Sequence, residues 1–221
     1  MTIDSKVFTF LSELEINNNR EWFAQNKQRF EDVKQNVLEF VGNLIAKINA
    51  FDPSIGDLPA NKTLFRIYRD TRFSSNKEPY KTNLGAVIVP VGYRSIWSYP
   101  AYYLHLKNNE CFVSMGVYMP DSASLKKIRS AIDSDFEQFE AIMRRIEPDF
   151  GAMSREEGAL QRVPAGFSKD SPAAEYLKLK HFYVFKPFSN RDVTKKDFLD
   201  KIAALFAQTY ELKCWLIEAN N

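Results

Sequence analysis

A long run of apolar residues at helical spacing occupies the N-terminal part of the chain. These residues recur every three or four positions from Trp22 to Ile48, with lysines and glutamates between them. Such a stripe predicts an amphipathic helix over residues 19–51. We expect the helix to end at Asp52-Pro53, because a residue before proline disfavours the helical conformation. A helix of this kind gains most of its stability by burying its apolar face, so it requires a core to pack on.

The rest of the chain alternates between helical and extended patterns. We expect further helices over residues 5–14, after Pro120, from Phe136 to a stop at Pro148, and from about Thr194 onward. Bulky or alternating apolar runs predict strands, which we place at residues 64–68, 84–89, 102–107, 111–119 and 181–185. The Asn108-Asn109-Glu110 run between two of these strands is typical of a hairpin turn.

The order of these segments predicts the fold class. Residues 1–221 contain no Gly/Ser/Pro-rich linker, charge block or repeat, so we expect a single domain. The hairpin favours antiparallel pairing, and the regular strand–helix alternation of a parallel sheet is missing. We therefore predict an α+β protein whose mostly antiparallel sheet packs against several helices, including the long N-terminal helix and a C-terminal helix.

Composition excludes several classes of protein. A hydrophobic content of 45% and an aromatic content of 14% are too high for a disordered chain. The apolar runs are much shorter than the roughly 20 residues that span a bilayer, and no signal-peptide pattern is visible, so we expect a cytoplasmic protein without a membrane association. The two cysteines, Cys111 and Cys214, lie in apolar surroundings, and we expect both to be reduced and not catalytic.

Positive charge is concentrated in one segment, although the whole chain has a net charge of only +2. Residues 62–81 contain two acids, Asp70 and Glu78. Against them stand six basic residues, which are Lys62, Arg66, Arg69, Arg72, Lys77 and Lys81. The segment lies on a polar loop between two apolar strands, where functional residues often gather.

The residue types in this segment fit an oxyanion. Arginine presents planar donors that can bind a carboxylate or phosphate two at a time. We predict a ligand-binding site formed by Arg66, Tyr68, Arg69, Asp70, Arg72, Lys77, Tyr80 and Lys81. Arg66, Arg69 and Arg72 would clamp the anion, while Asp70 would orient an arginine and a tyrosine would add a hydroxyl. Positions 66 and 72 share a strand face that 69 does not, so convergence requires the chain to turn near Asp70. The alternative is that these arginines pair with acids and stabilise a loop.

The run Arg66-Ile67-Tyr68-Arg69-Asp70-Thr71-Arg72-Phe73, followed by Asn76-Lys77 and Tyr80, resembles the signature of a bacterial conserved hypothetical family, a domain of unknown function of about this length. The resemblance also includes the run Asn18 to Phe23, Tyr102-Tyr103-Leu104, and the Met119-Pro120 step into a helix that carries Arg129. The family implies no known activity, so the resemblance supports a site without naming a reaction.

Three functions fit the basic segment. The first is a pocket for an anionic small molecule bearing phosphate or carboxylate, with or without its turnover. The second is a nucleic-acid module in which Phe73, Tyr80 and Tyr93 stack on bases, although a pI of about 8.4 is low for this class. The third is a protein-interaction or scaffold domain whose basic loop binds an acidic partner.

Other chemistry has weaker support. His105 and His181 are the only histidines, and neither lies at a metal-ligand spacing from a cysteine or the other histidine. Cys111 and a histidine could form a nucleophile–base pair, but no motif supports it. The sequence has no phosphate-binding glycine loop and no zinc-protease motif, so we expect no metal and no cofactor. Whether the protein is an enzyme stays open.

Overall fold

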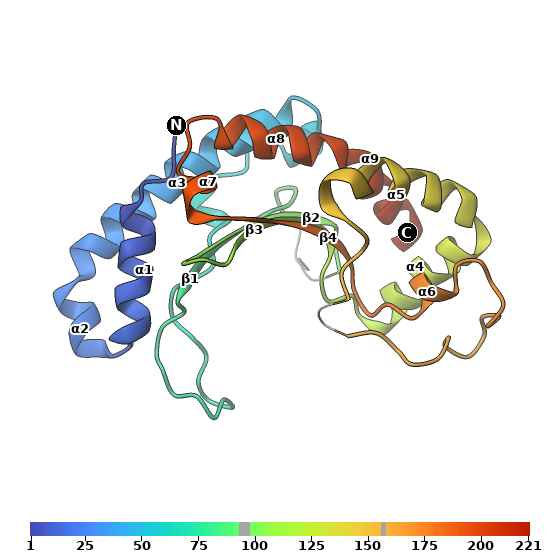
Figure 1. Ribbon diagram of the computed structural model, residues 1–221, viewed down its shortest axis with the longest axis horizontal. Coiled ribbons are helices and arrows are strands. Elements are labelled where there is room, and N and C mark those ends of the chain that lie inside the picture. Colours follow the sequence, from blue (N-terminus) through green and yellow to red (C-terminus); the bar gives the residue numbers. More distant parts are fainter. Residues whose placement is uncertain (93–97, 156–157) are drawn as a thin grey trace. The chain divides into compact units, whose positions relative to one another are not determined.

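The computed structural model describes residues 1–92, 98–155 and 158–221 (Figure 1). Within these residues the chain is α+β, as predicted, with helices and a four-stranded antiparallel sheet. The described residues group into two compact units, which we describe separately. The expectation of one domain over residues 1–221 stays a prediction.

The sheet has the strand order β1-β2-β3-β4 among the described residues. Its strands are β1 (Asn83–Ile88), β2 (Ala101–Lys107), β3 (Cys111–Val117) and β4 (Phe182–Phe188). Along β2, Leu104 and Leu106 are buried, whereas Tyr103 and His105 on the opposite face are partly exposed. This alternation follows from the two-residue period of a strand. Four of the five predicted strands are therefore confirmed. Residues 64–68 form only isolated bridges.

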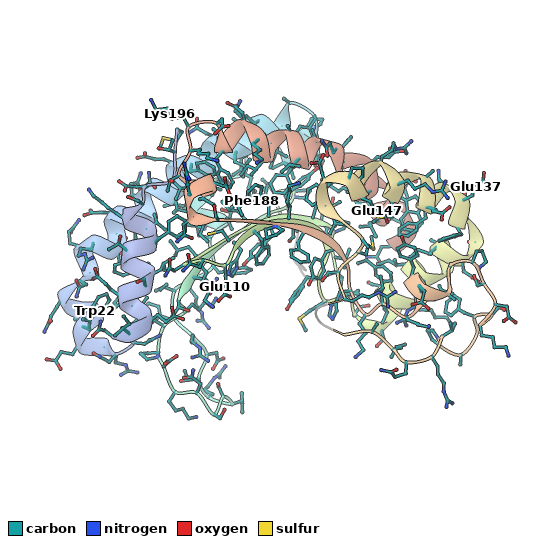
Figure 2. All side chains as sticks on the ribbon, viewed as in Figure 1. Trp22, Glu110, Glu137, Glu147, Phe188 and Lys196 are labelled. Atoms are coloured by element: carbon teal, nitrogen blue, oxygen red, sulfur yellow. The ribbon has the colours of Figure 1, made fainter. Side chains whose placement is uncertain are left out.

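The first unit consists of Met1–Val91, Tyr103–Val113 and Pro187–Ala204. Its helical elements are α1 (Lys6–Ile16), α2 (Arg20–Gln25), α3 (Lys27–Asn49), η1 (Pro53–Ile55), η2 (Ala60–Lys62), α7 (Asn190–Val193) and the first turns of α8 (Phe198–Gln208). The apolar stripe of α3 is buried, as predicted. Phe198 of α8 packs between Phe40 of α3 and Phe188 of β4, with ring centroids 5.9 and 5.1 Å away; Figure 2 labels Phe188.

The predicted helix over residues 19–51 is two helices in the structure. It is interrupted at Asn26, where α2 ends and α3 begins. The Asn26 side chain donates to the carbonyl oxygen of Trp22, and such local side-chain bonds compete with helix continuation. At the start of α2, the Asn19 side chain accepts a hydrogen bond from the Trp22 backbone and caps the helix.

The second unit consists of Gly92–Tyr102, Ser114–Lys186 and Leu205–Asn221. Its helices are α4 (Ser122–Ser134), α5 (Phe136–Phe150), α6 (Ala174–Leu177) and α9 (Tyr210–Asn220), together with the end of α8. Here Phe206 of α8 packs on Tyr102 of β2, with ring centroids 5.0 Å apart. Helix α5 passes Pro148, where we expected it to stop. The proline lies in the last turn, and Gly151 N still bonds to Glu147 O at 2.8 Å.

The predicted C-terminal helix also differs in detail. It begins at Phe198 and not near Thr194, which instead follows the short helix α7, whose capping box uses Ser189 and Asp192. The remainder divides at Thr209 into α8 and α9.

Candidate functional site

The basic segment folds into an irregular antiparallel hairpin, residues 64–82, which we call the basic hairpin. Its two arms are joined by backbone hydrogen bonds from Arg69 N to Pro79 O at 2.9 Å and from Lys81 N to Ile67 O at 2.7 Å. An isolated bridge pairs Tyr68 with Tyr80. The chain therefore turns beyond Arg69, as convergence of the site requires, and the hairpin projects from the N-terminal end of β1 (Figure 1).

Two of the three predicted clamp arginines pair with acids inside the hairpin. Arg72 binds Asp70 through two contacts, Nε to Oδ1 at 3.0 Å and Nη2 to Oδ2 at 2.7 Å. These bonds, with one from the Arg72 backbone, lower the pKa of the Asp70 carboxyl to about 2. Arg69 Nη1 lies 3.5 Å from Glu78 Oε2. Both pairs therefore fix the shape of the hairpin and offset its charge.

Three other cations of the hairpin form no ion pair with the described residues. Among the described residues, no carboxylate lies within ion-pair distance of Arg66, Lys77 or Lys81. Lys77 Nζ donates to the Thr71 carbonyl oxygen at 3.0 Å. Lys81 Nζ lies 5.1 Å from the centroid of the Phe65 ring. Burial, together with the nearby Arg66 charge, lowers the pKa of Lys81. The hairpin thus keeps an excess of positive charge after its two acids are paired.

The hairpin is anchored to the turn between α1 and α2. Asn18 bonds to both backbone groups of Tyr80. The Tyr80 ring stacks on Phe23, with centroids 4.0 Å apart and planes 14° apart. Tyr80 is only 4% exposed, so its ring serves this packing and has no free face for a base. Tyr68 is 54% exposed beside it. Tyr93, the third ring proposed for stacking, lies outside the described residues.

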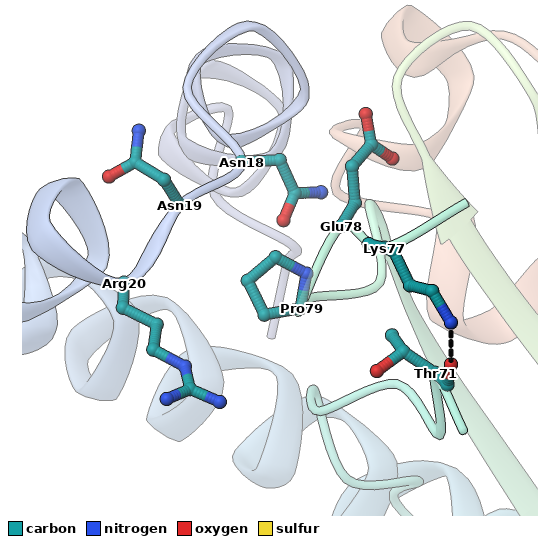
Figure 3. Close-up of a pocket in the computed structure, with 7 residues that line it drawn as sticks. All are labelled: Asn18, Asn19, Arg20, Thr71, Lys77, Glu78 and Pro79. Atoms are coloured by element: carbon teal, nitrogen blue, oxygen red, sulfur yellow. Dashed lines mark hydrogen bonds between the residues drawn. The ribbon is translucent and has the colours of Figure 1, made fainter. Parts of the chain in front are cut away.

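A hollow of about 450 Å³ lies where this turn meets the hairpin (Figure 3). Its lining residues are Asn18, Asn19, Arg20, Thr71, Lys77, Glu78 and Pro79. We call it the hairpin hollow. Arg20 and Lys77 supply cations from two segments far apart in the sequence, and Thr71 adds a hydroxyl. In Figure 3 the Glu78 carboxylate points away from the space between Arg20 and Thr71.

The groups that line the hairpin hollow differ in whether they already bond to other parts of the protein. Both asparagines are used by the fold, since Asn18 holds Tyr80 and Asn19 caps α2. Glu78 Oε2 accepts a hydrogen bond from Asn76 at 2.9 Å. Arg20, in contrast, has no carboxylate within ion-pair distance in the described part of the chain. The guanidinium of Arg20 is therefore the donor group best placed to receive an added ligand.

A second hollow has a volume of about 300 Å³ and is lined by some of the other predicted site residues. Its lining residues are Arg69, Asn76, Glu78, Tyr80, Lys81, Thr82 and Asn83. Three of these, Arg69, Asn76 and Glu78, bond to one another. The second hollow is therefore already internally satisfied over much of its polar surface.

The predicted site residues thus do not all line one hollow. Lys77 lines the hairpin hollow, and Arg69, Tyr80 and Lys81 line the second hollow. Arg66, Tyr68, Asp70 and Arg72 line neither of these two hollows. The three-arginine clamp stays a prediction. Sequence reasoning omitted Arg20 and Thr71 from the site, yet Arg20 belongs to the run Asn18 to Phe23 that carries the family resemblance.

The weaker candidates occupy other surroundings. His105 Nδ1 lies 2.9 Å from the Tyr103 hydroxyl, and its ring stacks on Phe112. Burial lowers the pKa of His105 to about 4, so the imidazole is neutral at pH 7. Cys111 Sγ donates to Lys107 O at 3.1 Å, and burial raises the pKa of this thiol to about 11.

Neither cysteine is in a disulfide, and no cluster of three or more histidine, cysteine or acidic residues suits a metal ion among the described residues. Arg129, part of the resemblance, is buried in the second unit, where its Nη2 donates to Leu179 O at 2.6 Å.

A family model described as a conserved hypothetical protein, DUF2461, matches residues 6–215. The chain belongs to this family. No curated protein and no solved structure matches the chain. No described helix is long and apolar enough to cross a membrane. Membership of DUF2461 confirms the kind of family that the resemblance predicts and brings no activity with it, so function must be argued from the site.

Proposed function

We propose that the first unit binds an anionic small molecule bearing phosphate or carboxylate at the basic hairpin, with the hairpin hollow as its main contact. One observation carries the proposal. Arg20 and Lys77 line the same hollow, and neither has a carboxylate within ion-pair distance among the described residues. Cations that share a hollow repel one another, and an anionic ligand would offset that repulsion.

The donors complement each other chemically. The Arg20 guanidinium offers a planar pair of donors that fits two oxygens of one phosphate or carboxylate. Lys77 donates one of its three N–H groups to the Thr71 carbonyl oxygen. This bond fixes the ammonium in place and leaves two N–H groups for a ligand. The Thr71 hydroxyl is a third donor. Arg66 and Lys81 lie outside this hollow and add to the positive field of the hairpin, which favours the approach of anions.

Calorimetric titration with pyrophosphate and with citrate tests the proposal. We expect the wild type to bind at least one of these anions. Arg20→Gln and Lys77→Gln should each weaken that binding about tenfold or more, since each removes a charge-assisted hydrogen bond. Arg144→Gln is the matched control, because Arg144 is also an exposed cation, lies on α5 of the second unit and pairs with Glu140. Absence of anion binding to the wild type, or equal losses in all three variants, would reject the site.

A further inference from the structure

Phe73 lies in the basic hairpin and is 95% exposed. It occurs in sequence between Thr71 and Lys77, the two hairpin donors of the hairpin hollow. Burial would remove a large apolar area from water, so an aromatic ring this exposed is available for a partner. Because the ring is 95% exposed, it contributes little to the packing of the described residues, and its substitution should cost little stability.

The surrounding loop holds Phe73 in a defined place. Lys77 Nζ bonds to Thr71 O and closes the loop across the phenylalanine. Arg72 is fixed by its double contact with Asp70. The Arg72 guanidinium carbon lies 5.7 Å from the centroid of the Phe73 ring. A cation at this distance interacts favourably with an aromatic face and helps to orient the ring.

The spacing between donor and ring restricts the ligand. Two peptide units separate Thr71 from Phe73, so their Cα atoms are at most about 7.6 Å apart. If Thr71 and Lys77 bind a phosphate, the Phe73 ring would therefore be within reach of a group that one sugar separates from that phosphate. In a nucleotide, one sugar separates the phosphate from a planar base. Aromatic side chains stack on such bases with little dependence on base identity.

We infer that the anionic ligand of this site is a nucleotide unit, with its phosphate at Arg20, Thr71 and Lys77 and its base on Phe73. The inference rests on the proposed function, and it adds the ligand class. The same chemistry is found in a free mononucleotide and in a single strand, and the experiment separates these two sources.

The first experiment compares ribose 5-phosphate with AMP by calorimetric titration, since the two differ by the base. We expect AMP to bind at least about fivefold more tightly, which is the lower end of the usual effect of one stacked base. Phe73→Ala and Phe73→Leu should abolish that advantage and leave ribose 5-phosphate binding unchanged. Leucine keeps apolar area and loses the flat ring, whereas Phe73→Trp should keep or increase the advantage.

The outcomes distinguish the two proposals. If ribose 5-phosphate binds and AMP binds no tighter, or if the advantage of AMP survives in Phe73→Ala, the nucleotide inference is overturned and anion binding stands. If neither ribose 5-phosphate, AMP, pyrophosphate nor citrate binds, anion binding fails and the inference fails with it.

The second experiment titrates a fluorescent fifteen-residue oligothymidylate. If a single strand is the natural ligand, the oligothymidylate should bind more tightly than AMP. Its affinity should fall with rising salt and should be weakened by Phe73→Ala. AMP binding without oligonucleotide binding assigns the site to a free nucleotide. Oligonucleotide binding that Phe73→Ala leaves unchanged would contradict the stacking role.

Discussion

The side-chain amide of Asn18 forms two hydrogen bonds with the Tyr80 backbone, as a neighbouring strand would. Its side-chain Nδ2 donates to Tyr80 O at 3.0 Å, and its Oδ1 accepts from Tyr80 N at 3.1 Å. Because both backbone groups are satisfied, the hairpin is held against the turn between α1 and α2. This same contact brings Arg20 and Lys77 to one hollow.

We expect Asn18→Ala to lower the free energy of unfolding by about 1–3 kcal/mol, because two backbone groups lose their partners. Anion affinity should fall as well, since the turn no longer holds the hairpin. Denaturant unfolding followed by circular dichroism measures the first effect. Asn43→Ala is the control, because the exposed Asn43 side chain bonds to Glu39 O within α3 and to no other described residue. Equal stability of the two variants would contradict the anchoring role.

The phenylalanines at positions 23 and 73 provide a matched pair. Phe23 is 5% exposed and stacks on Tyr80, whereas Phe73 is 95% exposed. Phe23→Ala should therefore cost about 3–5 kcal/mol, and Phe73→Ala should change stability by no more than about 0.5 kcal/mol. Thermal unfolding of both variants checks this difference. A large loss in Phe73→Ala would show that its ring is structural and would remove it as a ligand contact.

Local sequence patterns predict much of the fold, but they do not predict all of the helix boundaries. The α3 stripe from Phe30 to Ile48 is buried as its spacing requires. The interruption at Asn26 was missed because Asn26 sits within an otherwise helical spacing, and its bond to Trp22 O depends on one rotamer. The sequence predicts a stop at Pro148, yet α5 continues to Phe150, because a proline in the last turn removes only one hydrogen bond of the helix.

The site shows the same division between local and distant information. The acids of the basic segment do pair with its arginines, and these contacts are close in sequence. Arg20 reaches the hollow only through the pairing of Asn18 with Tyr80, a contact between residues far apart in the chain. No periodicity encodes such a contact. The available signal was the resemblance, which included both the run containing Arg20 and the run containing Lys77.

His105 should make stability depend on pH. Its pKa is about 4 in the folded protein, against an ordinary value of 6.5. Between these values the unfolded chain binds a proton that the folded protein does not, so stability falls as pH drops from 6.5 to 4. The full effect is on the order of 3 kcal/mol. His105→Phe should remove this component from denaturant unfolding across that range, and His181→Gln, which leaves His105 in place, should retain it. An unchanged slope in His105→Phe would contradict the burial of a neutral imidazole.

Cys111 should react slowly with thiol reagents in the native protein. The thiolate is the reactive form, and a pKa of about 11 leaves very little of it at pH 8. Cys214 is partly exposed and should be modified first. Timed alkylation of the Cys214→Ser variant, followed by mass spectrometry with and without denaturant, isolates Cys111. Rapid native labelling in that variant would show that the thiol is accessible and activated.

The same substitution at two glycines should change stability in opposite directions. A Cβ at Gly85 on β1 would lie 2.5 Å from the Tyr103 hydroxyl oxygen and 3.1 Å from two ring atoms. Tyr103 cannot easily move away, because its hydroxyl lies 2.9 Å from His105 Nδ1. Gly85→Ala should therefore cost about 1–3 kcal/mol. At Gly42, inside α3, the nearest atom to an added Cβ is Ala60 Cβ at 3.9 Å.

Gly42→Ala should stabilise the protein by about 0.5–1 kcal/mol, because alanine loses less backbone freedom in a helix. Unfolding in urea compares the two variants directly. Combining Gly85→Ala with Tyr103→Phe tests the cause, since removing the hydroxyl removes the shortest contact and should restore part of the lost stability. If Gly85→Ala is neutral, or if the double variant recovers nothing, the tyrosine does not lie against the backbone of β1 as described. A destabilising Gly42→Ala would instead show that α3 and η2 leave no room for a methyl group.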